Sequence, residues 1–308
     1  MKNLAIIDLG SNSARLSIQE ISDAGQSREV KRLKIQSRLA EGMGQDAGPK
    51  QLQPAAIKRT LAAIDKFKHI YEQYPHLKVT GIATAAVRAA ENRDDFLAQV
   101  KELTGVDVKV LSGEKEAYYD YLGVVSTLDI QDCLICDMGG GSFELALVRD
   151  KKAENLISIP YGAVSLSEKF HAAYQISGAD LFAFLRFIQD KFNQLPWLEK
   201  GRKLPLVLLG GANRTVGRRK LADAGKKDLD TMHGLKLSAA EFIDRYQSWL
   251  EMDLDQRRKA LGDEAERADI IIGGLTPVVQ LLGTLDIPQV IFSDSGVREG
   301  IIYELLHE

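Results

Sequence analysis

LICDMGGGSFEL, residues 134–145, is the stretch of sequence that decides the fold. An apolar strand ends in Asp137 and Met138, three glycines turn the chain, and a second apolar strand begins at Phe143. Linker glycines lie among polar residues, whereas these are flanked by apolar ones, so a tight turn is favoured over a flexible linker. Such a turn exposes several backbone N–H groups in an arrangement suited to a cluster of anionic oxygens. The stretch therefore predicts a phosphate-binding hairpin.

A second copy of this pattern, AIIDLGSNSARL, occupies residues 5–16. The two copies share an Asp, a Gly, a Ser and a Leu at a constant offset of 129 positions: Asp8, Gly10, Ser13 and Leu16 match Asp137, Gly139, Ser142 and Leu145. In both places an apolar strand brings an Asp to its end, a turn of small residues follows, and a second strand returns. The repeat predicts two related domains whose hairpins face each other across a cleft.

The length of 308 residues also favours two domains, each large enough to bury its own core. We expect domains over 1–125 and 126–308, with the last helix as a candidate for packing back on the first domain. We expect strands near 3–8, 14–21, 29–36, 78–83, 106–111, 133–137, 143–149, 153–159, 205–209 and 289–292. We expect helices near 54–74, 93–104, 113–127, 164–173, 178–194, 212–223, 238–250, 262–283 and 296–307. This order predicts the α/β class.

Composition narrows the class of protein. Apolar residues make up 45% and charged residues 27% of the chain, which is typical of a folded globular protein. No apolar run approaches the roughly 20 residues that span a bilayer, and MKNLAIIDLG leads into an acid rather than into a signal-peptide core. The net charge of −3 disfavours a general nucleic-acid binder. We therefore expect a cytoplasmic protein with neither a membrane nor a nucleic acid as partner.

The two cysteines, Cys133 and Cys136, stand in the sequence CLIC. This segment is predicted to be a strand, in which positions three apart point to opposite faces, so the thiols cannot easily bridge. A zinc site would need a second pair of ligands nearby, which the sequence lacks. We interpret both as structural residues.

The two hairpins supply the candidate metal ligands and phosphate donors. Asp137 and Glu144 are placed to hold Mg²⁺, a hard cation that is bound by one or two carboxylates together with substrate phosphates; Glu144 as an outward-facing strand residue is the alternative. In the first hairpin, Asp8 closes an apolar run, and such a buried acid needs a cation or a partner, which Arg15 could be. The candidate phosphate donors of the two turns are Ser11, Asn12, Ser13, Gly139, Gly140, Gly141 and Ser142, although a simple polar hairpin at 8–13 would look similar.

A third glycine turn lies in LLGGANRTVGRRK, residues 208–220. Its order of strand, Gly210 and Gly211, and helix places a helix N-terminus against a ligand. From Lys200 to Lys227 the chain has nine Lys or Arg and one acid. This excess predicts that Arg214 and Arg218, with neighbouring basic residues, form a track for a polyanion, the alternative being a solvated face.

Between the repeats, LSGEKEAYYDYLG places Glu114 and Glu116 in the first turn of a predicted helix. Acids there could simply complement the helix dipole. In GIATAAVR, residues 81–88, Thr84 and Arg88 follow another strand, and an Arg at that place can neutralise a phosphate with its bidentate fork.

Together these motifs resemble the exopolyphosphatase and guanosine pentaphosphate phosphohydrolase family, within the superfamily of acetate and sugar kinases, heat-shock chaperones and actin. The resemblance covers essentially the whole chain and is carried by DLGSNS at 8–13, TAAVR at 84–88, SGEKEA at 112–117, DMGGGSFEL at 137–145, LGGANR at 209–214 and SDSGVREG at 293–300. It implies two ribonuclease-H-like domains of the actin-like ATPase superfamily with an interdomain cleft, without the C-terminal helical domain of long relatives.

The resemblance also implies an activity, the removal of terminal phosphate from inorganic polyphosphate or guanosine pentaphosphate, with Mg²⁺ or Mn²⁺ as cofactor. Glu116 falls on the family's catalytic glutamate and Arg88 on its phosphate-contacting arginine. Lys115 stands where many relatives carry a second acid, which leaves the role of Glu114 open. Alternatives are a small-molecule kinase of the same superfamily and a non-catalytic polyphosphate or alarmone sensor. The sequence leaves open whether the protein forms a homodimer.

Overall fold

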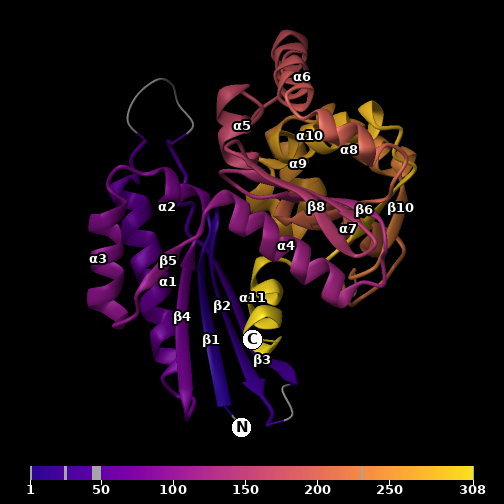
Figure 1. The fold of residues 1–308 in the computed structure, drawn as a ribbon. Helices are drawn as coiled ribbons and strands as arrows, with labels where there is room; N and C mark the ends of the chain where they lie inside the picture. Colours follow the sequence, from indigo (N-terminus) through magenta and orange to yellow (C-terminus); the bar gives the residue numbers. More distant parts are fainter. Residues whose placement is uncertain (1, 24–25, 44–49, 230–231, 308) are drawn as a thin grey trace. The chain divides into compact units, whose positions relative to one another are not determined.

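The computed structural model describes residues 2–23, 26–43, 50–229 and 232–307. The chain divides into two compact units (Figure 1). Unit 1 comprises Met1–Glu116 and Ile301–Glu308, and unit 2 comprises Ala117–Gly300. Each unit is built on one mixed sheet with helices, so the predicted two-part α/β fold is confirmed. The division falls inside the helix that also contains the predicted boundary at 125/126.

The sheet of unit 1 has the order β3-β2-β1-β4-β5. Its strands are β1 (Lys2–Leu9), β2 (Ser13–Ile21), β3 (Ser27–Gln36), β4 (Leu77–Ala83) and β5 (Val108–Val110). The first three strands are antiparallel neighbours, whereas β4 runs parallel to β1 and β5 parallel to β4. The carboxyl ends of β1, β4 and β5 therefore lie at one edge of this sheet.

The helices of unit 1 are α1 (Pro54–Tyr71), α2 (Ala85–Ala89) and α3 (Arg93–Thr104), and α4 (Gly113–Thr127) begins in it. Pro54 at the first position of α1 has the φ that a helix needs and lacks the N–H that would be unbonded there. Gly105 ends α3 in the left-handed conformation, with φ 73°. Ile64 and Phe67 of α1 and Phe96 of α3 pack on the side chains of β1 and β2, so these two helices cover one face of the sheet (Figure 1).

The sheet of unit 2 has the order β10-β11-β9-β6-β7-β8. Its strands are β6 (Cys133–Met138), β7 (Phe143–Arg149), β8 (Lys152–Ile159), β9 (Leu206–Gly210), β10 (Lys236–Ser238) and β11 (Gln289–Phe292). Read from β8 to β11, this order and its strand directions repeat those of β3 to β5, with β10 as an extra edge strand. The register also repeats, because Asp8 pairs with Arg15 and Asp137 with Glu144. The internal repeat inferred at an offset of 129 is thus a repeat of topology.

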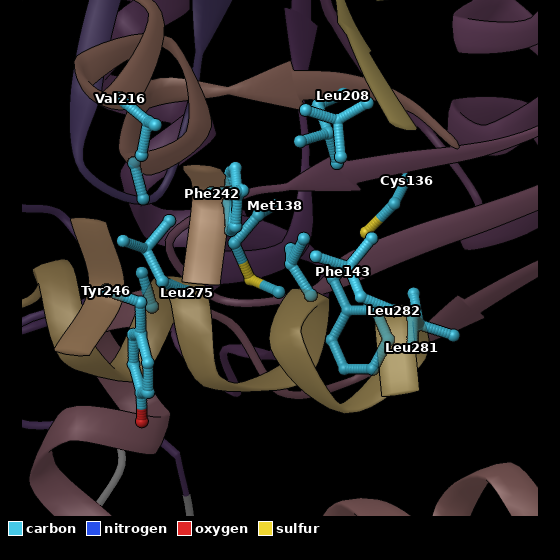
Figure 2. Packing of buried hydrophobic residues seen from close by; sticks show 14 of the residues in the cluster. Cys136, Met138, Phe143, Leu208, Val216, Phe242, Tyr246, Leu275, Leu281 and Leu282 are labelled. Carbon is cyan, nitrogen blue, oxygen red and sulfur yellow. The ribbon is translucent and has the colours of Figure 1, made fainter. Parts of the chain in front are cut away.

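The core of unit 2 is centred on α10 (Ile271–Thr284), of which ten residues are buried. Figure 2 shows Leu275, Leu281 and Leu282 of this helix among the core side chains. The helices of this unit are α5 (Ala163–Lys169), α6 (Gly178–Asn193), α7 (Gly211–Asp223), α8 (Ala239–Leu250), α9 (Leu254–Leu261) and α10 (Ile271–Thr284), with 3₁₀ helices at Pro196–Gly201 and Gly262–Arg267; α11 (Val297–His307) starts in unit 2. Leu275 and Leu281 of α10 pack against Met138 and Phe143 from the glycine hairpin. This packing fixes the base of the hairpin.

The two faces of β6 pack against different layers. Cys136 and Met138 belong to the core around α10, whereas Cys133 and Ile135 pack with Val124 of α4. The prediction that the two thiols point to opposite faces is therefore confirmed, and both are free and buried. Burial, reinforced by Asp132, raises the pKa of Cys133 to about 12. Asp137 has the same parity as Cys133 and Ile135, so its side chain lies on the α4 face of the sheet.

Several predicted elements differ from the structure. The single helix expected over 262–283 is wrong, because a 3₁₀ helix ends at Arg267 and α10 begins only at Ile271. Gly262, at φ 57°, and the non-helical backbone of Glu264 interrupt the helical path there. The short elements α2, α9 and β10 were not predicted, because three to eight residues leave too little periodicity to detect. Among the described residues, every helix is too short or too polar to cross a membrane.

Candidate functional site

An acidic cluster lies in unit 2 between its sheet and α4. Asp137 and Glu144 face each other directly across β6 and β7, and Asp120 approaches them from α4. One carboxylate oxygen from each residue lies within 4.8 Å of the others. Asp120 and Glu144 are buried and Asp137 is half-buried. Three converging carboxylates suit a hard divalent cation, which takes oxygen ligands, so these residues fit a metal such as Mg²⁺.

Two serine hydroxyls orient Glu144 within this cluster. Ser142 Oγ and Ser158 Oγ each donate to Glu144 Oε1 at 2.7 Å. Ser142 was predicted to bind phosphate. In the structure its hydroxyl donates a hydrogen bond to Glu144. The cluster also affects the neighbouring thiol of Cys136. Burial raises the pKa of Cys136 well above its usual range, and the negative charges of Asp137, Glu144 and Asp120 raise it further.

The glycine turn of unit 2 points its carbonyls at α5. Gly139 and Gly140 carbonyl oxygens accept from the N–H groups of Ala163 and Val164 at 2.9 Å each. In a trans peptide the N–H points opposite to the C=O, so the amides of Gly140 and Gly141 point away from α5. This arrangement requires glycine, because a Cβ on Gly162 would lie 2.5 Å from the carbonyl carbon of Gly140. The turn thus presents successive N–H groups in the way that anion-binding turns do.

The third glycine turn lies beside Asp137. Gly210 ends β9 at φ 89°, and a Cβ there would lie 2.7 Å from Asp137 Oδ1, so only glycine fits. Gly211 begins α7, and a Cβ on it would overlap the guanidinium of Arg267 at 2.2 Å. The first turn of α7 therefore lies between the acidic cluster and a buried arginine of the 3₁₀ helix.

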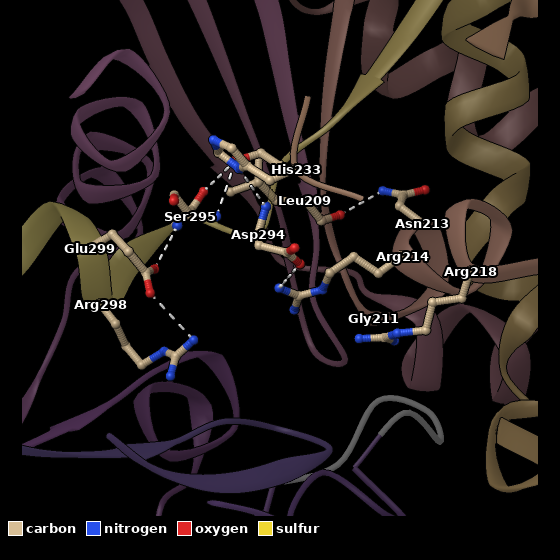
Figure 3. A network of polar contacts seen from close by, with 12 residues as sticks. Leu209, Gly211, Asn213, Arg214, Arg218, His233, Asp294, Ser295, Arg298 and Glu299 are labelled. Carbon is tan, nitrogen blue, oxygen red and sulfur yellow. Dashed lines mark hydrogen bonds and ion pairs between the residues drawn. The ribbon is translucent and has the colours of Figure 1, made fainter. Parts of the chain in front are cut away.

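Three basic residues of α7 are paired with acids from other segments, and Figure 3 shows Arg214 beside Asp294. Arg214 Nη1 lies 3.8 Å from Asp294 Oδ1, and Arg218 Nη1 lies 2.9 Å from Glu264 Oε1. Lys220 Nζ is 2.5 Å from Glu241 Oε1. Lys220, together with the hydrogen bonds of Ser238, holds the pKa of Glu241 at about 2. Part of the positive charge counted in the sequence is thus neutralised by acids in the fold. This reduces the positive charge with which α7 can attract a polyanion.

In unit 1, the first hairpin pairs Asp8 with Arg15. The two residues are directly opposite across β1 and β2, and Arg15 Nη1 lies 3.6 Å from Asp8 Oδ2, as the sequence suggested. Ser11 Oγ accepts from the N–H of Ala86 at 3.2 Å, which links the turn to the start of α2. The backbone carbonyls of Asn12 and Ser13 accept from Arg38 and Gly10. Acceptor atoms of Ser11, Asn12 and Ser13 therefore help to hold the turn in place.

Arg88 and Glu116 meet in unit 1, at the edge formed by the carboxyl ends of β4 and β5. Arg88 Nη1 donates to Glu116 Oε2 at 2.8 Å and to the carbonyl of Leu111 at 2.9 Å. Both side chains are largely buried, with 25% and 10% of their surface exposed. Glu114 is exposed, and Lys115 pairs with Glu304 at 2.7 Å. The two residues singled out as catalytic are thus in contact.

Sequence reasoning missed Asp120, the third member of the acidic cluster. The signal was present in AYYDYLGVV, where Asp120 interrupts the mostly apolar stretch of a predicted helix one turn after Glu116. It also missed Arg267 and Glu264, which reach α7 from an element that was predicted as the start of a long helix.

Comparisons with known proteins place this geometry in context. Residues 17–308 match the sequence model of the Ppx/GppA phosphatase family. The chain is 28% identical, over 97% of its length, to a bifunctional 3-dehydroquinate synthase/phosphatase of Fusobacterium nucleatum, and covers 46% of that protein. It is 28% identical, over 98% of its length, to a guanosine-5′-triphosphate,3′-diphosphate pyrophosphatase of Photobacterium profundum, and covers 59% of that protein. The chain thus spans about half the length of the curated relatives it matches.

Solved structures show the same fold. A Ppx/GppA family member of Aquifex aeolicus matches with a TM-score of 0.79 and 27% identity, over 99% of this chain and 98% of that one. An exopolyphosphatase of Cytophaga hutchinsonii matches with a TM-score of 0.89 and 22% identity, over 99% of this chain and 98% of that one. These likenesses extend over both units.

Proposed function

Because the chain belongs to the Ppx/GppA phosphatase family, we propose that it is a metal-dependent phosphohydrolase that releases terminal phosphate from inorganic polyphosphate. Guanosine pentaphosphate is the further substrate that we propose. The observation that carries the proposal is the acidic cluster, in which Asp120 of α4 meets Asp137 and Glu144 of the hairpin whose Gly140 and Gly141 amides point away from α5. Carboxylates for a cation and amides for phosphate oxygens are what phosphoanhydride hydrolysis requires.

We propose Mg²⁺, with Mn²⁺ as a substitute, as the cation of this cluster. When bound, it neutralises the charge of the phosphate oxygens. In this proposal Asp137 and Glu144, the ligands expected from the sequence, hold the cation together with Asp120. The hydrogen bonds from Ser142 and Ser158 support this, because they fix the orientation of the Glu144 carboxylate. Asp8 remains a candidate metal ligand in unit 1, although Arg15 already balances its charge.

We propose that Glu116 positions the attacking water and accepts its proton, and that Arg88 binds a substrate phosphate. The hydrogen bond between them supports this, because it fixes the direction of the Glu116 carboxylate. In phosphoryl transfer, orienting the nucleophile contributes along with the electrostatic stabilisation. We place the remaining phosphate contacts at Ser11, Asn12, Ser13, Gly139, Gly140, Gly141, Ser142, Gly210, Gly211, Arg214 and Arg218. A cytoplasmic location and a homodimer stay predictions.

Incubation of the purified protein with long-chain polyphosphate, guanosine pentaphosphate and ATP, with Mg²⁺, tests the function directly. We expect release of inorganic phosphate from polyphosphate, and its loss in excess chelator. Transfer of phosphate from ATP to an alcohol or carboxylate acceptor would instead identify a kinase. Binding of polyphosphate without release would identify a sensor.

A further inference from the structure

His233 connects two segments of unit 2 that are far apart in sequence (Figure 3). Its Nδ1 lies 3.3 Å from the backbone nitrogen of Asp294, and its Nε2 lies 3.2 Å from the carbonyl oxygen of Thr127. A backbone N–H can only donate and a carbonyl can only accept. Nδ1 therefore accepts from Asp294 and Nε2 donates to Thr127, so the ring uses both nitrogens at once.

Each partner of His233 belongs to a segment that also reaches the candidate site. Thr127 ends α4, the helix that carries Asp120, and its carbonyl is among the last four that a helix leaves without an internal partner. Asp294 follows β11, and its carboxylate lies 3.8 Å from Arg214 Nη1 (Figure 3). Arg214 in turn lies in the first turn of α7, three residues after Gly211.

The segment of Asp294 is short and held mainly by local bonds. Ser293 Oγ donates to the carbonyl of Ser295 and accepts from its N–H, so Asp294 lies inside a tight turn. The N–H of Ser293 donates to Leu208 of β9 at 3.0 Å. Among the described residues, the bond to His233 ties the backbone of Asp294 itself to a distant part of the unit. His233 is set in place by its neighbour Gly234, whose N–H donates to Phe292 of β11 at 2.8 Å.

We propose that His233 is a positioning residue for substrate phosphate. Through the N–H of Asp294 it holds the Asp294 carboxylate beside Arg214, and the carboxylate fixes the direction in which the Arg214 guanidinium meets the substrate. This inference rests on the proposed function, in which Arg214 contacts phosphate. A residue that acts in this way changes the affinity for substrate more than the rate of the chemical step.

Three variants distinguish the effects of the two hydrogen bonds that the His233 ring makes. His233→Asn keeps an oxygen at the place of Nδ1 and so retains the acceptor for Asp294. His233→Gln places its amide nitrogen near the position of Nε2 and retains the donor to Thr127. His233→Ala removes both. We expect the KM for tripolyphosphate to rise roughly fivefold in His233→Ala and His233→Gln, which corresponds to the loss of one hydrogen bond. In these two variants kcat should change less than about twofold. In His233→Asn the KM should stay near that of the wild type.

A second measurement tests the route through Asp294. If His233 acts through that residue, His233→Ala should add nothing to the KM of an Asp294→Ala variant, since the two changes share one path. Calorimetric binding of tripolyphosphate to the Glu116→Gln background gives the same comparison without turnover. Melting temperatures of all variants report whether each has folded.

The outcomes are distinct. Unchanged KM in His233→Ala, or rescue by Gln and not by Asn, would overturn the assignment of His233 while leaving the phosphatase function standing. Wild-type protein that neither hydrolyses nor binds tripolyphosphate would overturn the proposed function, and the role of His233 with it.

Discussion

Arg15 and Glu144 occupy the same position in the two repeated hairpins. Because their charges are opposite, the two hairpins differ in the charge that they present to a ligand. Arg15 lies 3.6 Å from Asp8 and balances it, whereas Glu144 stands opposite Asp137 and adds a second acid. Only the second hairpin therefore concentrates negative charge, and Asp120 adds to it. This one difference between the two hairpins accounts for an acidic cluster in unit 2 and an ion pair in unit 1.

Replacing Glu116 by Gln tests the residue to which we assign the reaction. The amide has the same shape and can still accept from Arg88, but it cannot take a proton from water. We expect phosphate release to fall by about 10²–10⁴-fold, the usual contribution of a general base, with an unchanged melting temperature. Wild-type turnover in this variant would remove Glu116 from the mechanism.

Ser158 offers a test of the cluster that leaves every carboxylate in place. Its hydroxyl donates to Glu144 Oε1, and loss of such a supporting hydrogen bond commonly weakens metal affinity by about 10–100-fold. We therefore expect Ser158→Ala to bind Mn²⁺ more weakly than the wild type in a titration followed by electron paramagnetic resonance.

Ser126→Ala is the matched control for this change, because in the described part of the chain its hydroxyl donates to the carbonyl of Gly123 within α4 and to no group of the cluster. Equal Mn²⁺ affinity in Ser158→Ala and Ser126→Ala would show that the hydroxyl of Ser158 does not support the cluster.

Among the elements, α4 shows both the reach and the limit of sequence reasoning. Its bounds, Gly113–Thr127, were predicted correctly from periodicity. Asp120 was nevertheless missed, because its partners Asp137 and Glu144 come from strands that follow later in the chain. Helical spacing shows which residues share a face of α4, but which strands that face covers is decided by tertiary packing.

The glycine turn packs closely against the start of α5, and Gly162→Ala should disrupt this packing. The new Cβ would lie 2.5 Å from the carbonyl carbon of Gly140, so the turn must shift and its bonds to Ala163 and Val164 must lengthen. We expect a lower melting temperature and a large loss of phosphate release. The control is Gly178→Ala, where a Cβ meets nothing within 4 Å and stability should hold or rise slightly. Equal behaviour of the two variants would contradict this account of the turn.

For α7, we expect that Lys220, one of the basic residues near Arg218, takes no part in the predicted polyanion track. Lys220 pairs with Glu241, and exposed pairs of this kind contribute little to stability. We expect Lys220→Ala to raise the pKa of Glu241 from about 2, and to change the affinities for long polyphosphate and for tripolyphosphate by the same small factor. Both affinities should be measured at two salt concentrations, because a selective, salt-dependent loss for the long chain would restore Lys220 to the track.

At the scale of the whole molecule, the repeat was the most informative feature of the sequence. Matching residues at 8–16 and 137–145 predicted two α/β units, and the two sheets share strand order, direction and register. The two hairpins followed because each copy combines a strand that brings an Asp to its end, a turn of small residues and a returning strand. The partners of Arg214 and Arg218 did not follow, since Asp294 and Glu264 reach α7 from distant segments. The interdomain cleft implied by the family resemblance stays a prediction.

The central claim is that Asp120, Asp137 and Glu144 together hold the cation that phosphate release requires. The most direct test measures phosphate release from polyphosphate across a range of Mg²⁺ concentrations for the wild type and Asp120→Asn, with Asp129→Asn as control. Asp129 is an exposed acid of the same unit, with 95% of its side chain accessible. We predict that Asp120→Asn needs at least tenfold more Mg²⁺ for half-maximal activity, while Asp129→Asn matches the wild type. The same Mg²⁺ dependence in all three proteins would contradict the account.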